Sequence, residues 1–274
     1  MSQNLSPRVI LIICEGESDL TALNVLKYFT KKLSVDAECK PIIQIIKTKG
    51  DKTTKQTFIN GVPQNYLYQD CIDLISDSIR DRLTKMCLGK KVYLDDIDRV
   101  FFITDMDGVY ISQDDIREAD HYLDNDPYYG IDAIYTEGKV GRIASRNWRK
   151  RENLNYFLAD NRYITLRVGG KEKTVPFNLF YMSCNLDHVL SEEANMPKYD
   201  KDNNACGWYT SVTESGSNKE IKEFFYSVYP DTEYGYQQSW HYITKPHSSR
   251  SLERGSNCSL ILDYIEYVTR RKKQ

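Results

Sequence analysis

The chain has 274 residues, of which 41% are hydrophobic and 28% charged, and its formal net charge at pH 7 is −2. This is the composition of an ordinary soluble protein, long enough for one large domain or two small ones. No apolar stretch approaches the ~20 residues that cross a bilayer. Residues 1–8 also lack the pattern of a signal peptide, so we expect a cytoplasmic location.

Hydrophobic periodicity predicts alternating strands and helices up to residue 104. An apolar run at 9–14 predicts a buried strand, and apolar side chains at helical spacing predict a helix over 19–32. A strand over 41–47, a helix over 66–86 and a strand over 98–104 follow. This order predicts an α/β fold with a mostly parallel sheet and helices on both faces.

The second half of the chain is predicted to continue the same alternation. Its expected elements are a helix over 114–124, a short strand over 132–135, a helix over 145–160, a strand over 177–184, and helices over 186–193, 221–229 and 259–273. Residues 198–216 are polar and rich in turn-forming residues. We expect a domain boundary or a surface excursion there.

Acidic residues follow two of the predicted strands. Glu15 and Asp19 lie after residues 9–14, and Asp105 and Asp107 lie after residues 98–104. Ligands gather at the carboxyl ends of parallel strands, so we expect these carboxylates to share one crevice. Crowded carboxylates repel one another, and a hard divalent cation such as Mg²⁺, with Mn²⁺ as a substitute, relieves that repulsion. As an alternative for Asp19, an acid near a helix N-terminus caps the helix.

A strand that ends in Glu-Gly-x-x-Asp, followed later by a strand that ends in Asp-x-Asp, resembles the Toprim domain. The resemblance implies a four-stranded parallel sheet flanked by helices, with Glu15 as metal ligand or acid/base and Asp105 and Asp107 as Mg²⁺ ligands. Asp19 is similar to the extra acid of OLD-like nucleases. Asp187 follows the predicted strand 177–184, where small nuclease-like relatives carry a further acid. These five residues are therefore the expected metal ligands.

The same resemblance implies a domain organisation and a setting. We expect a catalytic domain over residues 8–197 with a basic insertion at about 139–173, and a helical C-terminal extension over 198–274. The chain contains no P-loop, so an OLD-type ATPase would be a separate polypeptide. A stand-alone Toprim nuclease of bacterial abortive-infection and phage-defence systems is the expectation. Its expected partners are nucleic acid and a controlling ATPase or sensor, and a homo-oligomer is compatible with the sequence.

Residues 139–173 hold ten basic and three acidic residues in a chain whose net charge is negative. Such asymmetry favours a phosphate-binding face, and interleaved aromatic residues such as Trp148 could stack on bases. The expected nucleic-acid contacts are Lys139, Arg142, Arg146, Arg149, Lys150 and Arg151. A smaller basic stretch, at Lys47, Lys49, Lys52 and Lys55, is expected to form a lip over the crevice.

Two other functions remain open at the level of sequence. Asp105-Met106-Asp107-Gly108 also looks like the first motif of haloacid-dehalogenase phosphatases, in which Asp105 would be the nucleophile and Ser183 could imitate the second motif. That motif normally starts its domain, whereas here an acidic strand end precedes it. The second alternative is a non-catalytic adaptor that binds nucleic acid or a partner. A requirement for Glu15 distinguishes the nuclease from the phosphatase.

Overall fold

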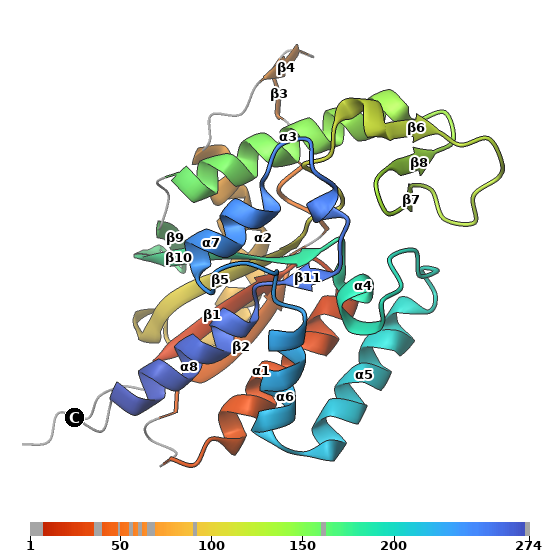
Figure 1. Ribbon diagram of the computed structural model, residues 1–274. Helices are drawn as coiled ribbons and strands as arrows, with labels where there is room; N and C mark the ends of the chain where they lie inside the picture. The colour runs from red at the N-terminus through yellow and green to blue at the C-terminus, as the bar shows by residue number, and fades with distance from the viewer. Residues whose placement is uncertain are drawn as a thin grey trace, which may run out of the picture.

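The computed structural model describes residues 8–35, 40–48, 50–54, 57–59, 62–64, 69–89, 92–159 and 163–271. These residues form an α/β fold in which a mixed sheet lies between two layers of helices (Figure 1). The predicted α/β class is therefore confirmed. None of the helices in the described part of the chain has the length and apolar character that a membrane span requires.

Four strands of the main sheet lie side by side and run parallel, in the order β2, β1, β5, β10. Their bounds are Ile42–Lys47 (β2), Val9–Cys14 (β1), Ile97–Asp105 (β5) and Lys171–Ser183 (β10). Two further strands, β9 (Tyr163–Val168) and β11 (Gly255–Ser256), pair antiparallel with β10. The sheet is thus mixed and has six strands, whereas the resemblance implied four parallel strands.

The order of the strands reverses at the centre of the sheet. The chain passes from β1 to β2 on one side and then crosses back to β5 on the other side of β1. In open α/β sheets such a reversal leaves a crevice beyond the carboxyl ends of the two central strands. Glu15 directly follows β1 and Asp105 ends β5, so the topology places both acids at this crevice.

Helices cover both faces of the sheet because the central strands are apolar on both sides. Leu11 and Ile13 of β1 belong to one core, and Ile10 and Ile12 belong to the other, as the two-residue period of a strand requires. The first core is closed by α2 (Gln69–Leu88), α3 (Val140–Ala159) and α7 (Tyr236–Ile243). The second is closed by α1 (Glu17–Lys32), α4 (Leu186–Ser191), α5 (Lys201–Ser215), α6 (Asn218–Ser227) and α8 (Ser259–Arg271). Figure 1 shows these two layers above and below the sheet.

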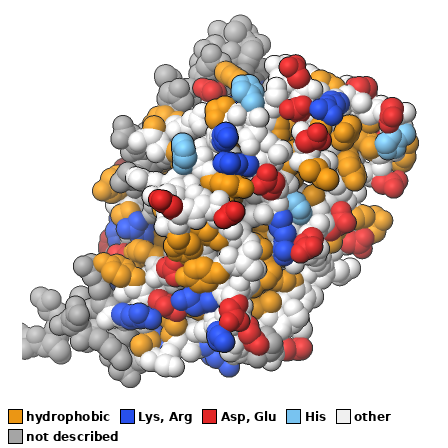
Figure 2. All heavy atoms as spheres, in the orientation of Figure 1, with side chains coloured by type: hydrophobic (Ala, Val, Ile, Leu, Met, Phe, Trp, Pro, Cys, Tyr) orange, Lys and Arg blue, Asp and Glu red, His pale blue; other side chains and the backbone are white. Residues whose placement is uncertain are grey.

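Short strands form two smaller sheets beside the main one. One is a hairpin of β3 (Thr57–Ile59) and β4 (Val62–Gln64). The other contains β6 (Ile116–Glu118), β7 (Tyr128–Tyr129) and β8 (Ile134–Thr136). In Figure 2, acidic side chains gather over the β6 to β8 region, while acidic and basic side chains are interspersed over the rest of this face.

The structure differs from the predicted elements in two segments. Instead of a helix over 114–124 the chain forms a short 3₁₀ turn and β6; Ile116 and Leu123 are both buried, and their spacing of seven residues imitates a helix. The segment 198–216, where the sequence suggested a domain boundary or a surface excursion, contains α5. Few large apolar residues mark that helix, yet Ala205 is buried and Trp208 packs against the core that α5 shares with α1.

Candidate functional site

The structure brings together the four acids that follow β1 and β5. Burial raises the pKa of Asp105 well above its usual range, and repulsion from Asp19, Asp107 and Glu15 raises it further. Burial also raises the pKa of Glu15 well above its usual range, with repulsion from Asp51 as the next cause. The Thr104 hydroxyl of β5 also donates a hydrogen bond to Glu15 Oε1 at 2.5 Å, so the acids that follow β1 and β5 meet at the carboxyl ends of the two central strands.

A buried lysine from α3 lies among these carboxylates. The Lys150 Nζ atom is 3.2 Å from Asp107 Oδ2, 3.3 Å from Asp51 Oδ2 and 4.0 Å from Glu15 Oε1, and the side chain is fully buried. Burial alone would lower the pKa of Lys150, but attraction to Asp51 and Glu15 outweighs it and raises the pKa well above its usual range. The site is therefore an acidic crevice built around a permanent ammonium group.

The loop after β2 contributes Asp51, which sequence reasoning missed. Its Oδ1 atom accepts hydrogen bonds from the Thr53 backbone N–H at 2.7 Å and from Thr53 Oγ1 at 2.5 Å, which leaves Oδ2 for Lys150. This is the local side-chain to backbone pattern by which aspartate stabilises a turn. The Asp-x-Thr triplet at 51–53 could have predicted this turn. Nothing in it indicated that the turn would meet a helix one hundred residues away.

Asp107 is held in a defined position by the residues around it. Its backbone has a positive φ of 51°, and its N–H donates to the Cys184 carbonyl at 2.7 Å. The Tyr129 hydroxyl donates to Asp107 Oδ1 at 3.0 Å, and Arg146 Nη2 donates to the Asp107 carbonyl at 3.0 Å. Burial alone would raise the pKa of Asp107, but Lys150 and Arg146 outweigh burial and lower it. Asp107 is consequently the acid best stabilised as a carboxylate.

Asp19 has a structural task in addition to its position near the crevice. Its Oδ2 atom accepts hydrogen bonds from the Gly16 N–H at 2.7 Å and the Glu15 N–H at 3.2 Å. These bonds satisfy free amides at the start of α1, as the capping alternative expected. They also fix the backbone of Glu15, so Asp19 positions the neighbouring acid.

Asp187 is buried at the start of α4 and is held by two residues of α5. Lys201 Nζ lies 3.1 Å from Asp187 Oδ2, and Asn204 Nδ2 donates to Asp187 Oδ1 at 3.1 Å. Repulsion from Asp187 contributes to the raised pKa of Asp19, after burial as the first cause. Asp187 therefore borders the crevice, and its own charge is already balanced by Lys201.

The expected phosphate-binding face is largely engaged within the chain. Lys150 is fully buried and lies among the acids of the site, not on the outer surface of α3. Arg146 bonds to Asp107 and Tyr129, Lys139 forms an ion pair with Asp126, and Arg149 Nε donates to the Thr54 carbonyl at 3.1 Å.

Two of the expected contacts, Arg142 and Arg151, do not pair with any acidic side chain in the part of the chain that the structure describes. Both lie on α3. In the expected lysine lip, Lys47 forms an ion pair with Glu17, and Lys49 and Lys55 lie outside the described residues.

The donor set suits a hard cation such as Mg²⁺. All the candidate ligands are carboxylate oxygens, and no described residue donates a hydrogen bond to the largely buried Asp105 carboxylate. Burial and repulsion among the acids raise the pKa of Glu15 and of Asp105, and a bound cation would relieve that repulsion. No three of the described His, Cys, Asp or Glu side chains are already gathered as a ligand set.

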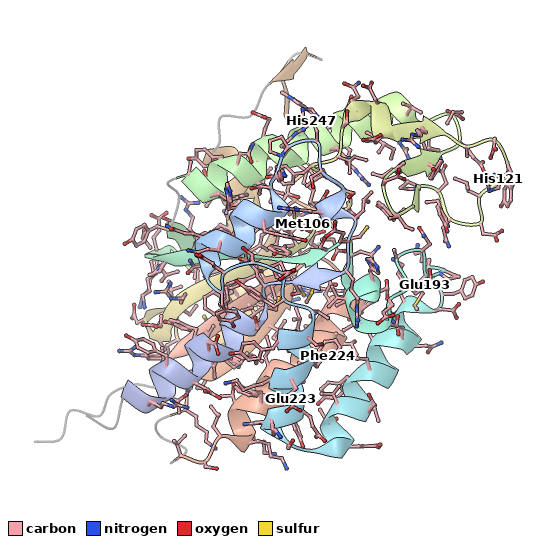
Figure 3. All side chains as sticks on the ribbon, in the orientation of Figure 1. Met106, His121, Glu193, Glu223, Phe224 and His247 are labelled. Atoms are coloured by element: carbon pink, nitrogen blue, oxygen red, sulfur yellow. The ribbon has the colours of Figure 1, made fainter. Side chains whose placement is uncertain are left out.

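His121 lies away from this arrangement. Met106 follows β5 near the centre of the molecule in Figure 3, whereas His121 lies at the edge, on the loop beyond β6. The side chain of His121 is 75% exposed and contacts Asp120. His188 follows Asp187, but burial lowers its pKa and its Nδ1 atom has no hydrogen-bond partner among the described residues.

Comparisons of the chain with protein-family models, curated proteins and solved structures found no match.

Proposed function

We propose that this protein is a Toprim-like nuclease that uses Mg²⁺, or Mn²⁺ in its place, to hydrolyse phosphodiester bonds of DNA or RNA. The observation that carries the proposal is the meeting of Glu15, Asp105 and Asp107 around Lys150 at the point where the strand order reverses. Two parallel strands that end in acids supply oxygen ligands for a divalent cation. The buried ammonium supplies positive charge where a phosphate would lie.

Each residue has a distinct task in this proposal. Asp105 and Glu15 would hold the metal with Asp107, while Asp19 and Asp187 support the crevice as caps and ion-pair partners. Mg²⁺, when bound, polarises a phosphoryl oxygen and lowers the pKa of a bound water. Lys150 would orient the phosphate and offset the charge that grows on its oxygens in the transition state. Glu15 serves as ligand or as proton acceptor.

The proposed setting is bacterial defence against phage, in the cytoplasm. An unrestrained nuclease would damage its host, so we propose a separate ATPase or sensor protein that controls it. Expression of the chain alone tests this part. Growth arrest that depends on Glu15 would show that the nuclease needs no release by a partner.

The phosphatase alternative has less support from the described contacts. Ser183, which would bind phosphate in that mechanism, is fully buried, and its hydroxyl donates to the Arg250 carbonyl at 3.1 Å. In addition, Glu15, which follows β1, takes part in the same charge cluster as Asp105, and a phosphatase that uses Asp105 as nucleophile does not require it.

The test is cleavage of plasmid DNA, single-stranded DNA and transfer RNA with Mg²⁺ or Mn²⁺. We expect Glu15→Gln and Asp105→Asn to abolish cleavage, and Asp120→Asn, whose side chain is 94% exposed, to leave it unchanged. Hydrolysis of a generic phosphomonoester that needs Asp105 but not Glu15 would establish the phosphatase instead. Binding of nucleic acid without any hydrolysis would identify an adaptor.

A further inference from the structure

Helix α3 presents two different faces to the molecule. Its inward face is buried against the rest of the molecule, and consists of Ile143, Asn147, Lys150, Asn153, Leu154 and Phe157. A neighbouring face, which carries Trp148 and Arg151, lines a groove of about 400 Å³ between α3 and residues 111–116. The charged inward face belongs to the site described above. The groove is a separate feature that the proposed hydrolysis does not use.

The groove combines an apolar floor with polar walls. Ile111 and Ile116 are buried at its base, and Gln113 and Ser145 line its exposed sides. The indole of Trp148 is 45% exposed beside them. The guanidinium of Arg151 pairs with no acidic side chain among the described residues. Such a site offers a flat aromatic surface, hydrogen-bonding groups for a polar edge and one uncompensated positive charge.

The exposure of Trp148 distinguishes it from the other two tryptophans of the chain. Trp240 is 3% exposed and stands against Tyr181, and Trp208 packs against Phe224. Both serve the cores of the fold. Trp148 is left with its ring in the groove and at the surface, where an indole is an efficient platform for stacking.

We propose that this groove binds a base of single-stranded DNA or RNA, stacked on Trp148, while Arg151 contacts an adjoining phosphate. The proposal rests on the nuclease proposed above and deepens it by naming an unpaired strand as substrate. Asn147, which also lines the groove, donates to the Gly108 carbonyl at 3.2 Å, next to Asp107. The bound base would therefore belong to a nucleotide that flanks the phosphate to be cut.

Tryptophan fluorescence tests the groove independently of cleavage. The protein carries Glu15→Gln and is titrated in Ca²⁺ with a single-stranded DNA 12-mer, an RNA 12-mer of the same sequence, an abasic DNA strand and a blunt duplex. We expect saturable quenching by the two base-bearing single strands and little by the abasic strand or the duplex. Since Trp240 lies in one core and Trp208 packs against the other, Trp148→Phe should remove the quenching signal.

Affinity is then measured with labelled strands. Trp148→Ala should weaken single-strand binding by about five- to 150-fold, which corresponds to the loss of one stacked base. Arg151→Gln should weaken binding and reduce its dependence on salt. Controls are Tyr93→Ala, an exposed aromatic that precedes β5, and Lys219→Gln, an exposed charge on α6 across the sheet. Neither should change the affinity.

The outcomes separate the two proposals. Cleavage by the wild type without quenching, or equal quenching by abasic and base-bearing strands, would refute base binding in the groove and would not affect the nuclease proposal. Quenching by single strands without cleavage in Mg²⁺ would support the groove and refute the nuclease. If neither occurs, both are refuted. The DNA and RNA arms show which polymer supplies the base.

Discussion

Replacing Lys150 by methionine would remove the positive charge at the centre of the acidic crevice and keep most of the side-chain volume. Its three carboxylate partners are only 12% (Glu15), 22% (Asp51) and 20% (Asp107) exposed, so water cannot screen them well once the ammonium is gone. We expect Lys150→Met to destabilise the metal-free protein strongly and Mg²⁺ to restore part of the loss.

The magnitude follows from the distances. At an effective dielectric constant of about 20, a contact of 3.2–4.0 Å is worth about 4–5 kcal/mol of attraction before desolvation is subtracted. Desolvation of the ammonium cancels much of the sum, and removal of one partner from a buried ion pair typically costs about 3–5 kcal/mol. In a chain of this size, such a loss lowers the Tm by roughly 6–20 °C.

Thermal unfolding in EDTA and in excess Mg²⁺ measures the effect. The control is Arg142→Met, on the exposed surface of the same helix, which should change the free energy of unfolding by less than about 0.5 kcal/mol. Mg²⁺ should raise the Tm of Lys150→Met more than that of the wild type, because the cation replaces the missing charge. An unchanged Tm in EDTA would falsify the view that Lys150 balances the crevice. Equal effects of Mg²⁺ on both proteins would contradict metal binding beside it.

Two further predictions concern the backbone around the site and the cysteines. At Gly108, φ is +67° and an added Cβ would lie 2.6 Å from Leu252 Cδ2, whereas at Gly138 φ is +62° and the space is open. Gly108→Ala should therefore lower the free energy of unfolding by about 1–3 kcal/mol more than Gly138→Ala. Equal unfolding free energies for the two variants would contradict this packing. Burial raises the pKa of Cys258 to about 12, so brief iodoacetamide treatment should label the exposed Cys206 and spare Cys258. Mass spectrometry measures the labelling of each cysteine. Early labelling of Cys258 would show that α8 opens.

The sequence predicted the parts of the site that are encoded locally. Glu15 and Asp105 each follow a continuous apolar run, and such runs predict parallel strands whose ends share one edge of a sheet. The same periodicity predicted the alternation of strands and helices, and therefore a sheet with helices on both faces. These features depend on short-range periodicity, which a single sequence displays in full.

The contacts that give the site its character were not predictable in this way. Lys150 resembles its neighbours Arg149 and Arg151 in sequence, and only the rotation of α3 decides which of the three is buried. Asp51 lies in a turn without hydrophobic periodicity. The pairing of β11 with β10 joins residues more than seventy positions apart through two ladder positions, too few to leave a pattern.

The C-terminal segment, which the sequence predicts as an extension, contributes contacts and charge to the crevice. Lys201 of α5 balances Asp187, and its positive charge also interacts with Asp105 and Asp107. The Ser251 carbonyl accepts a hydrogen bond from the Gly108 N–H at 3.2 Å. The crevice is therefore set between two lysines, Lys150 from one helical layer and Lys201 from the other. Both layers must fold against the sheet before the charges of the strand-end acids are balanced.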